Sequence, residues 1–299
     1  MRILIWGALI IFAALILLII YCRTENRKFR VTRYSYKTDR VKEKLTLCVL
    51  ADLHCYVYGE NNQRLFDAIR EINPDLVISA GDMTDGSRYA KGNCETLEFL
   101  SRLAKAFPFV YGSGNHEYKL MYGRNHKYER VRNDFRKGLE NAEKSGQPLE
   151  ILDNRDLDLP DKNIKIYGLN LGREYFFRTG PIPLPKEKMD SLVGKADPER
   201  LNILIGHNPE YFDAYAEWGA DLVLSGHVHG GMVRTPWNRG IISPRMQLFP
   251  KYDRGVFEKG KTTMILSGGI GNHTIHVRIN NRAELLVVEV IPDGHIGAS

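Results

Sequence analysis

Short apolar runs recur along this chain, and polar residues follow each of them. Five of the runs are three to six residues long, which is typical of a strand buried on both faces: 45–50, 76–80, 107–111, 201–205 and 222–224. Residues 62–73 and 93–104 instead carry apolar residues at helical spacing, and 263–266 and 285–291 have the pattern of further strands. This alternation predicts a layered α/β protein.

The polar residues after the five runs form short motifs. They read D-L-H at 52–54, G-D at 81–82, G-N-H at 114–116, G-H at 206–207 and G-H-V-H at 226–229. The loops at the carboxyl ends of strands in an α/β sheet line one shared crevice, so we expect these residues to converge there. A glycine precedes Asp82, Asn115, His207 and His227, and we expect it to allow a tight turn that aims the next side chain inward.

The converging side chains have the chemistry of metal ligands. Carboxylates, imidazoles and one amide oxygen suit divalent Mn, Fe or Zn, and no thiolate is needed. Each motif alone is common, since G-D pairs form turns and loop histidines often bond only to backbone. The ordered set uses five of the nine histidines, and this context predicts a joint metal site.

With Glu117 after His116, the set resembles the pattern of the calcineurin-like metallophosphoesterase superfamily over about residues 46–292. The resemblance implies an α/β fold, a four-layer α/β/β/α sandwich of two mixed sheets. It also implies two divalent ions, with manganese favoured, and a ligand set for each ion. One ion would bind Asp52, His54, Asp82 and His229, and the other would bind Asp82, Asn115, His207 and His227, so that Asp82 bridges them.

Two adjacent ions define a mechanism. Ions about 3.5 to 4 Å apart lower the pKa of a shared water, and the resulting metal-activated hydroxide attacks the phosphorus in line. The leaving group then needs a proton or a cation, for which His116 is the candidate catalytic acid. The resemblance assigns it the same role, and the alternative is that His116 only orients a ligand. Asp85 is interpreted as a turn-forming residue.

The predicted activity is hydrolysis of phosphodiester or phosphoanhydride bonds. A phosphomonoesterase or protein phosphatase is the alternative within the enzymes. A non-catalytic binding scaffold of the same fold is disfavoured, because every residue of the ligand pattern is present.

The N-terminus carries a second strong signal. Residues 3–21 contain no charge, and 19 apolar residues are close to the length of a membrane-spanning helix. The alternatives are a buried core helix and a cleaved signal peptide, but the bulky Ile20 and Tyr21 are unsuited to a cleavage site. We therefore predict a transmembrane anchor at 1–21, a basic juxtamembrane tether at 22–45, a catalytic domain at 46–292 and a C-terminal tail at 293–299.

Charge is concentrated beside this anchor. Residues 22–44 hold nine Lys or Arg against three acids, so their net charge of +6 equals that of the whole chain. The stretch could bind anionic headgroups or act only as a solvated tether. It favours a cytoplasmic catalytic domain, although the short N-terminal tail also suits the opposite orientation. Residues 45–299 are nearly neutral, which disfavours nucleic acid as a partner, and the four cysteines lack the paired spacing of a disulfide framework.

Two basic and aromatic segments follow metal motifs and are expected to shape the substrate pocket. Residues 118–146 are predicted to be largely helical, and residues 230–260 to form a rim loop. The predicted substrate contacts are Arg234, Trp237 and His273, with packing inside the loops as the alternative. Residues 230–253 and 271–274 also resemble a membrane-associated bacterial branch of the superfamily that includes phosphodiesterases and sugar-nucleotide lipid pyrophosphohydrolases. This resemblance suggests a lipid-linked or nucleotide-linked phosphate ester as substrate.

Overall fold

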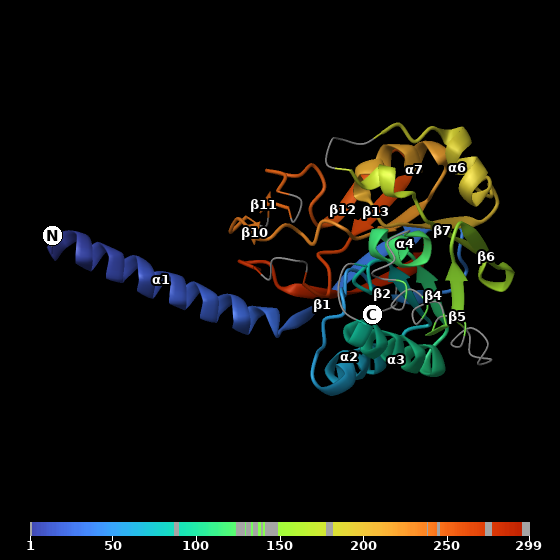
Figure 1. Ribbon diagram of the computed structural model, residues 1–299. Helices are drawn as coiled ribbons and strands as arrows, with labels where there is room; N and C mark the ends of the chain where they lie inside the picture. The colour runs from blue at the N-terminus through green and yellow to red at the C-terminus, as the bar shows by residue number, and fades with distance from the viewer. Residues whose placement is uncertain are drawn as a thin grey trace.

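The apolar runs form the central strands of two sheets (Figure 1). The computed structural model describes residues 2–86, 90–123, 129, 133, 137–138, 140, 149–177, 182–237, 239–243, 246–272 and 277–294. The first sheet has the order β1 (Phe29–Thr38), β14 (Ala283–Pro292), β2 (Leu45–Leu50), β3 (Leu76–Ala80), β4 (Phe109–Gly112) and β5 (Leu149–Leu152). Its neighbours are parallel except for the antiparallel pair of β14 and β2.

The second sheet is also mixed. Its order is β12 (Gly255–Lys259), β13 (Thr262–Leu266), β9 (Leu222–Ser225), β8 (Leu201–Gly206), β7 (Ile164–Leu169) and β6 (Arg155–Leu159). The strands from β13 to β7 are parallel, and the two edge strands run antiparallel to their neighbours. Both sheets therefore have parallel centres, whose carboxyl ends can support a shared crevice.

Alternating side chains divide the core into layers. Leu47 of β2 and Ile203 of β8 belong to one buried cluster between the sheets. Leu50 of β2 points the other way, toward helices α2 (Gln63–Ile72) and α3 (Ala90–Ala106), whereas Leu204 of β8 faces α6 (Lys186–Val193) and α7 (Phe212–Trp218). Because both faces of each central strand are covered, the strands are continuously apolar. The predicted α/β/β/α sandwich of two mixed sheets is confirmed.

The segment predicted as a tether, residues 22–45, instead contains regular structure. Helix α1 (Arg2–Asn26) continues beyond residue 21, and β1 pairs with β14 over ten residues. Side chains of β1 alternate between half-buried and exposed, and Thr32 Oγ1 donates a hydrogen bond to the buried Glu284 carboxylate at 3.0 Å. The exposed basic residues of β1 lie on a sheet edge, where charge discourages pairing with another chain. Much of the basic stretch is thus an edge strand of the catalytic fold.

Helix α1 projects away from the two sheets (Figure 1). An 18-residue window within Leu4–Asn26 has a mean hydropathy of 2.9, and the large apolar side chains from Leu4 to Tyr21 are exposed. Its last turns contact the catalytic fold, where Cys22 and Asn26 are buried and Glu25 pairs with Arg282 at 3.0 Å. The length and composition of α1 suit a membrane anchor and equally a signal sequence.

The segments expected to form the substrate pocket are partly described. Helix α4 (Asn115–Tyr122) covers the start of the predicted helix at 118–146, and most of the remainder lies outside the described residues. The predicted rim loop at 230–260 includes a short hairpin of β10 (Val233–Arg234) and β11 (Gly240–Ile242), followed by edge strand β12. Single 3-10 turns occur at Glu60–Asn62, Pro160–Lys162, Arg173–Phe176 and Pro209–Tyr211.

Candidate metal centre

All five polar motifs lie just beyond the carboxyl ends of parallel strands. β2, β3 and β4 of the first sheet lead to the loops of Asp52, Asp82 and Asn115, while β8 and β9 of the second lead to those of His207 and His227. The two sheets face each other across their common core, so these loops meet at one end of the sandwich. Residues from both halves of the chain therefore converge there, as their positions after the apolar runs predict.

The donor atoms of these loops form three overlapping groups. Within each group they lie no more than 4.8 Å apart: Asp52, His54 and His229; His54, Asp82 and His116; Asp82, His207 and His227. The Nε2 atoms of His54 and His229 are 3.0 Å apart, and His207 Nε2 is 3.1 Å from Asp82 Oδ2. His54 and Asp82 each belong to two groups, so the donors form one continuous cluster with a carboxylate near its middle.

An amide oxygen belongs to the residue that precedes His116 of this cluster. Asn115 Oδ1 is buried, and no hydrogen-bond partner for it occurs among the residues that the structure describes. A buried carbonyl oxygen without a partner is costly, and a bound cation would satisfy it. Together with the His and Asp groups, it makes a donor set that suits two divalent ions.

The backbone of these loops is strained where the donors attach. Asp52, His54, Asp82, His227 and His229 all adopt left-handed conformations, with φ between 47° and 74°. Such conformations are uncommon for residues with a side chain and concentrate at functional sites. They aim successive donors of the D-L-H and H-V-H motifs into the same crevice.

The preceding glycines act mainly by leaving space, which differs from the tight turns that we expected. Of the four, only Gly81 has a positive φ, of 96°. A Cβ atom on Gly114 would lie 2.3 Å from Asp82 Oδ1, and one on Gly226 would lie 2.6 Å from Asp52 Oδ2. The glycines therefore allow neighbouring loops to approach the donor carboxylates closely.

Hydrogen bonds from the surrounding backbone orient the donors. His207 Nδ1 contacts the carbonyl oxygen of Ala80 at 2.7 Å, which turns Nε2 toward the cluster. The N–H of His116 donates to Asp82 Oδ1 at 2.8 Å, leaving Oδ2 directed at His207. The N–H of His227 donates to both oxygens of Asp52, at 2.9 and 3.0 Å. Each motif is thereby tied to another motif distant in sequence.

The buried carboxylates of the cluster favour the binding of positive charge. Burial raises the pKa of Asp52 to about 7, although the neighbouring His207 favours its charged form. Burial also opposes ionisation of Asp82, but the charges of His207 and His116 hold the pKa of Asp82 well below its ordinary value. Burial lowers the pKa of His207, and the carboxylates of Asp82 and Asp52 outweigh this effect and raise it to about 9. The proton on His207 thus supplies positive charge to these carboxylates, and a bound divalent cation can supply that charge in its place.

Comparison with known proteins agrees with this geometry. The model of the calcineurin-like phosphoesterase family matches residues 45–231, more than half of the chain and all five motifs. The chain belongs to this family. As a calcineurin-like phosphoesterase with this His and Asp cluster, it is a metal-dependent phosphoesterase.

Individual relatives of this calcineurin-like phosphoesterase are distant. It is 24% identical over 289 residues to the uncharacterized protein YpbG of Bacillus subtilis, covering 94% of this chain and 95% of YpbG. It is also 24% identical over 245 residues to phosphodiesterase YaeI of Escherichia coli, covering 81% of this chain and 80% of YaeI. The crystal structure of TT1561 of Thermus thermophilus superposes with a TM-score of 0.46 and 9% identity, covering 75% of this chain and 89% of that one.

Glu117 is a buried organiser of the site whose role the sequence did not reveal. Its carboxylate accepts hydrogen bonds from the backbone N–H groups of Asp82, Thr84 and Gly114 at 2.7 to 2.9 Å, and from Thr84 Oγ1 at 2.8 Å. Glu117 therefore fastens the G-D loop to the G-N-H-E loop directly behind Asp82. The G-N-H-E motif contained this residue, but only the fold identifies its partners.

Replacing Glu117 with Gln is expected to destabilise the protein and loosen the centre. The amide NH2 group would face backbone N–H donors, so we expect the free energy of unfolding to fall by about 2–4 kcal/mol. Metal affinity should fall about 10-fold to 100-fold, because the support of Asp82 is disturbed. Thermal unfolding and metal titration measure both effects. Glu98→Gln on the exposed side of α3 is the matched control, and equal behaviour of the two variants would contradict this role.

His116 contacts a carboxylate that the sequence interpretation treated only as a turn former. Asp85 Oδ1 lies 3.3 Å from His116 Nδ1, and the N–H of Gly86 donates a hydrogen bond to the same nitrogen at 3.0 Å. Burial lowers the pKa of His116, but the carboxylates of Asp82 and Asp85 outweigh this effect and raise it. The two carboxylates therefore favour a proton on the imidazole, the group that a general acid transfers.

Two further residues of the site carried no usable sequence signal. Arg278 is buried and donates hydrogen bonds to the carbonyl oxygens of Gly268, Gly269 and Gly271 at 2.6 to 3.1 Å. This glycine-rich loop packs against Asp52, since the N–H of Gly271 donates to the Asp52 carbonyl at 2.9 Å. Phe176 lies beside the metal cluster, with its ring centre 5.3 Å from that of His227.

The predicted substrate contacts have different environments. The side chain of Arg234 is fully buried, and its guanidinium group bonds to the carbonyl of Gly230 and pairs with Asp253 at 3.4 Å. These contacts hold the loop together, and a substrate contact of Arg234 stays a prediction. Trp237 is 86% exposed on the β10–β11 hairpin. His273 lies outside the described residues.

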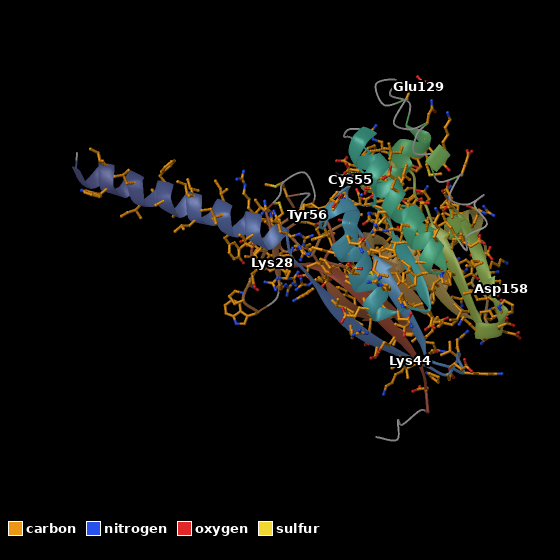
Figure 2. The ribbon with its side chains drawn as sticks, turned by 90° about the horizontal axis from the view of Figure 1, so that it is seen from below. Lys28, Lys44, Cys55, Tyr56, Glu129 and Asp158 are labelled. Carbon is orange, nitrogen blue, oxygen red and sulfur yellow. The ribbon has the colours of Figure 1, made fainter. Side chains whose placement is uncertain are left out.

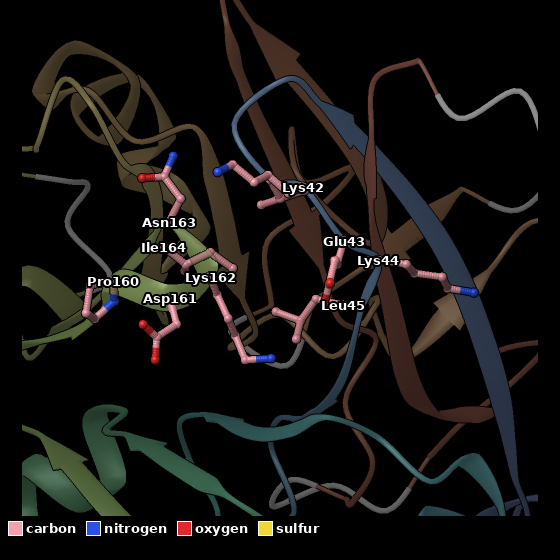
Figure 3. A pocket seen from close by; sticks show the side chains of 10 residues that line it. Lys42, Glu43, Lys44, Leu45, Pro160, Asp161, Lys162, Asn163 and Ile164 are labelled. Atoms are coloured by element: carbon pink, nitrogen blue, oxygen red, sulfur yellow. The ribbon is translucent and has the colours of Figure 1, made fainter.

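A separate hollow of about 400 Å³ lies away from this centre (Figure 3). It is lined by residues 41–45 and 160–164, which include Lys42, Glu43 and Asp161. These residues precede or begin β2 and β7, so the hollow is at the amino ends of the strands, whereas the metal motifs follow the carboxyl ends. Its residues contribute no group to the His and Asp cluster.

Proposed function

We propose that this chain is a membrane-anchored phosphoesterase that hydrolyses phosphodiester or phosphoanhydride bonds with two divalent ions. The ligands in this proposal are the seven residues predicted above: Asp52, His54 and His229 on one side, Asn115, His207 and His227 on the other, and Asp82 between them. The observation that carries it is the membership of Asp82 in two overlapping donor groups, together with the buried, unpartnered oxygen of Asn115, the residue before His116.

The residues around the ions have separate tasks. Ions bound here would supply an activated water and would polarise the phosphoryl oxygens. His116 would donate a proton from Nε2 to the oxygen of the leaving group, because Nδ1 accepts the hydrogen bond of the Gly86 N–H. Asp85, 3.3 Å from Nδ1, would contribute negative charge beside the ring. Asp52 and Asp82, both buried, would keep their charge on the cluster, and Phe176 would shield one side of it from water.

Several features support a diester or anhydride substrate at a membrane. The relative YaeI is named a phosphodiesterase, and the exposed apolar helix α1 suits an anchor that keeps the enzyme beside lipids. We propose residues 1–21 as the anchor, 46–292 as the metallophosphoesterase domain and 293–299 as a tail. The basic residues after the anchor favour a cytoplasmic catalytic domain. Manganese is the proposed native ion. The proposed substrate is a lipid-linked or nucleotide-linked phosphate ester.

Chelation is expected to abolish hydrolysis of bis(p-nitrophenyl) phosphate by the purified chain, and added manganese is expected to restore it. His227→Ala should prevent restoration, because it removes one donor of the second group. Activity that persists through chelation, or that is unchanged in His227→Ala, would contradict the metal mechanism. Faster turnover of p-nitrophenyl phosphate or a phosphopeptide than of the diester would instead favour the phosphomonoesterase or protein phosphatase alternative.

A further inference from the structure

A hollow of about 510 Å³ lies where the last turns of α1 meet the catalytic fold. Its lining comes from α1 on one side and from Tyr56, Asn272 and Val277 on the other. Figure 2 labels Tyr56 and Lys28 where the helix meets the body of the protein. The hollow thus lies at the junction of the apolar helix and the phosphoesterase domain.

The residues that α1 contributes form two rows along the helix. Leu18, Cys22 and Asn26 recur every four residues, and the latter two are buried against the domain. Ile19 and Arg23 form the neighbouring row, and Arg27, the first residue after α1, continues it. This second row changes from apolar to cationic over eight residues, or about 12 Å along the helix axis.

The change from apolar to cationic coincides with the end of the apolar segment. Leu18 and Ile19 belong to the uncharged run of residues 3–21, whereas Arg23 and Arg27 follow it. If α1 spans a bilayer, as the proposed function assumes, the first pair lies among acyl chains and the second at the level of the headgroups. The hollow therefore crosses the boundary between the acyl chains and the headgroups of one leaflet.

The two arginines are available to an anion. Nearby basic residues have acidic partners: Lys28 and Arg282 pair with Glu25, and Arg30 pairs with Glu284. Among the described residues, no carboxylate lies within 4.0 Å of the guanidinium groups of Arg23 and Arg27. Two like charges one helical turn apart repel each other, and an anion between them removes that cost.

The opposite wall belongs to segments that carry the metal centre. Tyr56 follows His54 by two residues, and its N–H donates to the carbonyl of Leu53 at 2.9 Å. Asn272 follows Gly271, whose N–H donates to the Asp52 carbonyl, and Asn272 Oδ1 accepts a hydrogen bond from Arg278. A ligand in the hollow would thus contact both the membrane helix and the loops behind Asp52.

We propose that this hollow binds one anionic phospholipid of the surrounding bilayer. Its phosphate lies between Arg23 and Arg27, and an acyl chain lies along Leu18 and Ile19. This site is separate from the metal cluster, and it rests on the membrane-anchored part of the proposed function. The bound lipid would fix the position of the end of α1 relative to the loops of Tyr56 and Asn272.

The test measures binding of phosphatidylglycerol to the full chain in nonionic detergent, after chelation so that no hydrolysis occurs. We expect one lipid per chain, and we expect Arg23→Gln/Arg27→Gln to raise the dissociation constant about 30-fold, which corresponds to about 2 kcal/mol. Arg33→Gln/Lys37→Gln removes the same charge from the exposed side of β1 and should change binding less than about threefold. Arg23→Lys/Arg27→Lys should retain most of the affinity, since it keeps both charges.

Three outcomes would overturn the proposal. Equal weakening by the two Gln pairs would mean that binding reports only net charge. Equal affinity for glycerol 3-phosphate or inorganic phosphate would mean that the hollow takes a free anion and not a lipid. Loss of binding in the Lys pair as well as the Gln pair would mean that the charges do not hold the headgroup. Because binding is measured without metal, inactivity toward bis(p-nitrophenyl) phosphate after manganese loading would count against the proposed function alone.

Discussion

Asp82→Asn is expected to lower kcat/KM for a phosphodiester about 1000-fold or more. Asp82 is the carboxylate common to two donor groups, and its Oδ2 faces His207 while Oδ1 is held by the backbone of His116. An amide at this position supplies no negative charge between two cations, and a loss of about 4 kcal/mol of stabilisation corresponds to that factor. Steady-state kinetics in saturating manganese, together with the metal content of the variant, measure the effect.

The control for this variant is Asp161→Asn. Asp161 lies in the hollow at the amino ends of the strands, away from the centre, and the same chemical change there should leave activity and metal content unaltered (Figure 3). If Asp82→Asn kept both its activity and its full metal content, Asp82 would not be the shared ligand.

His116→Gln is expected to lower kcat by about 100-fold to 10,000-fold for a diester with an alkyl leaving group. The loss should be much smaller for bis(p-nitrophenyl) phosphate, because p-nitrophenolate is a stable anion that leaves without a proton. Metal content should stay near that of the parent chain. Asp85→Asn should show the same dependence on the leaving group with a smaller loss, because it removes the carboxylate at His116 Nδ1.

The dependence of the kcat loss on the leaving group distinguishes proton donation by His116 from a role in supporting the metal ligands. An equal loss for both substrates, accompanied by loss of metal, would indicate that His116 acts as a ligand or holds one in place. His116 does belong to one donor group with His54 and Asp82, so this outcome has a structural basis. A loss confined to the alkyl substrate supports proton donation by His116.

The central strands could be predicted because burial on both faces leaves a continuous apolar run in the sequence. β2, β3, β8 and β9 agree closely with the runs, as do α2 and the late strand β14. β1 escaped prediction because its half-buried face lies within a strongly basic stretch, where exposed charges obscure the alternation. β6 and β12 are edge strands with mostly exposed or half-buried side chains, so their sequences carry little hydrophobic signal.

The convergence of the candidate ligands could be predicted because each follows a strand within a few residues. Residues that support them are harder to recognise, since their partners are distant in sequence. Arg278 organises a loop behind Asp52, more than 200 residues earlier in the chain, and Asp85 faces His116 across 31 residues. Arg234 illustrates the converse, because a cationic residue on a rim loop proved to be buried in an ion pair with Asp253. Local sequence indicates which groups are capable of metal binding or catalysis, and the fold determines which partners they have.

Metal stoichiometry tests the central claim most directly. The purified chain would be stripped with chelator, loaded with excess manganese, freed of unbound ion and examined by elemental analysis. The account predicts about two ions per chain for the parent protein and fewer than one for Asp82→Asn. A well-folded parent chain that binds fewer than one ion under these conditions would contradict it.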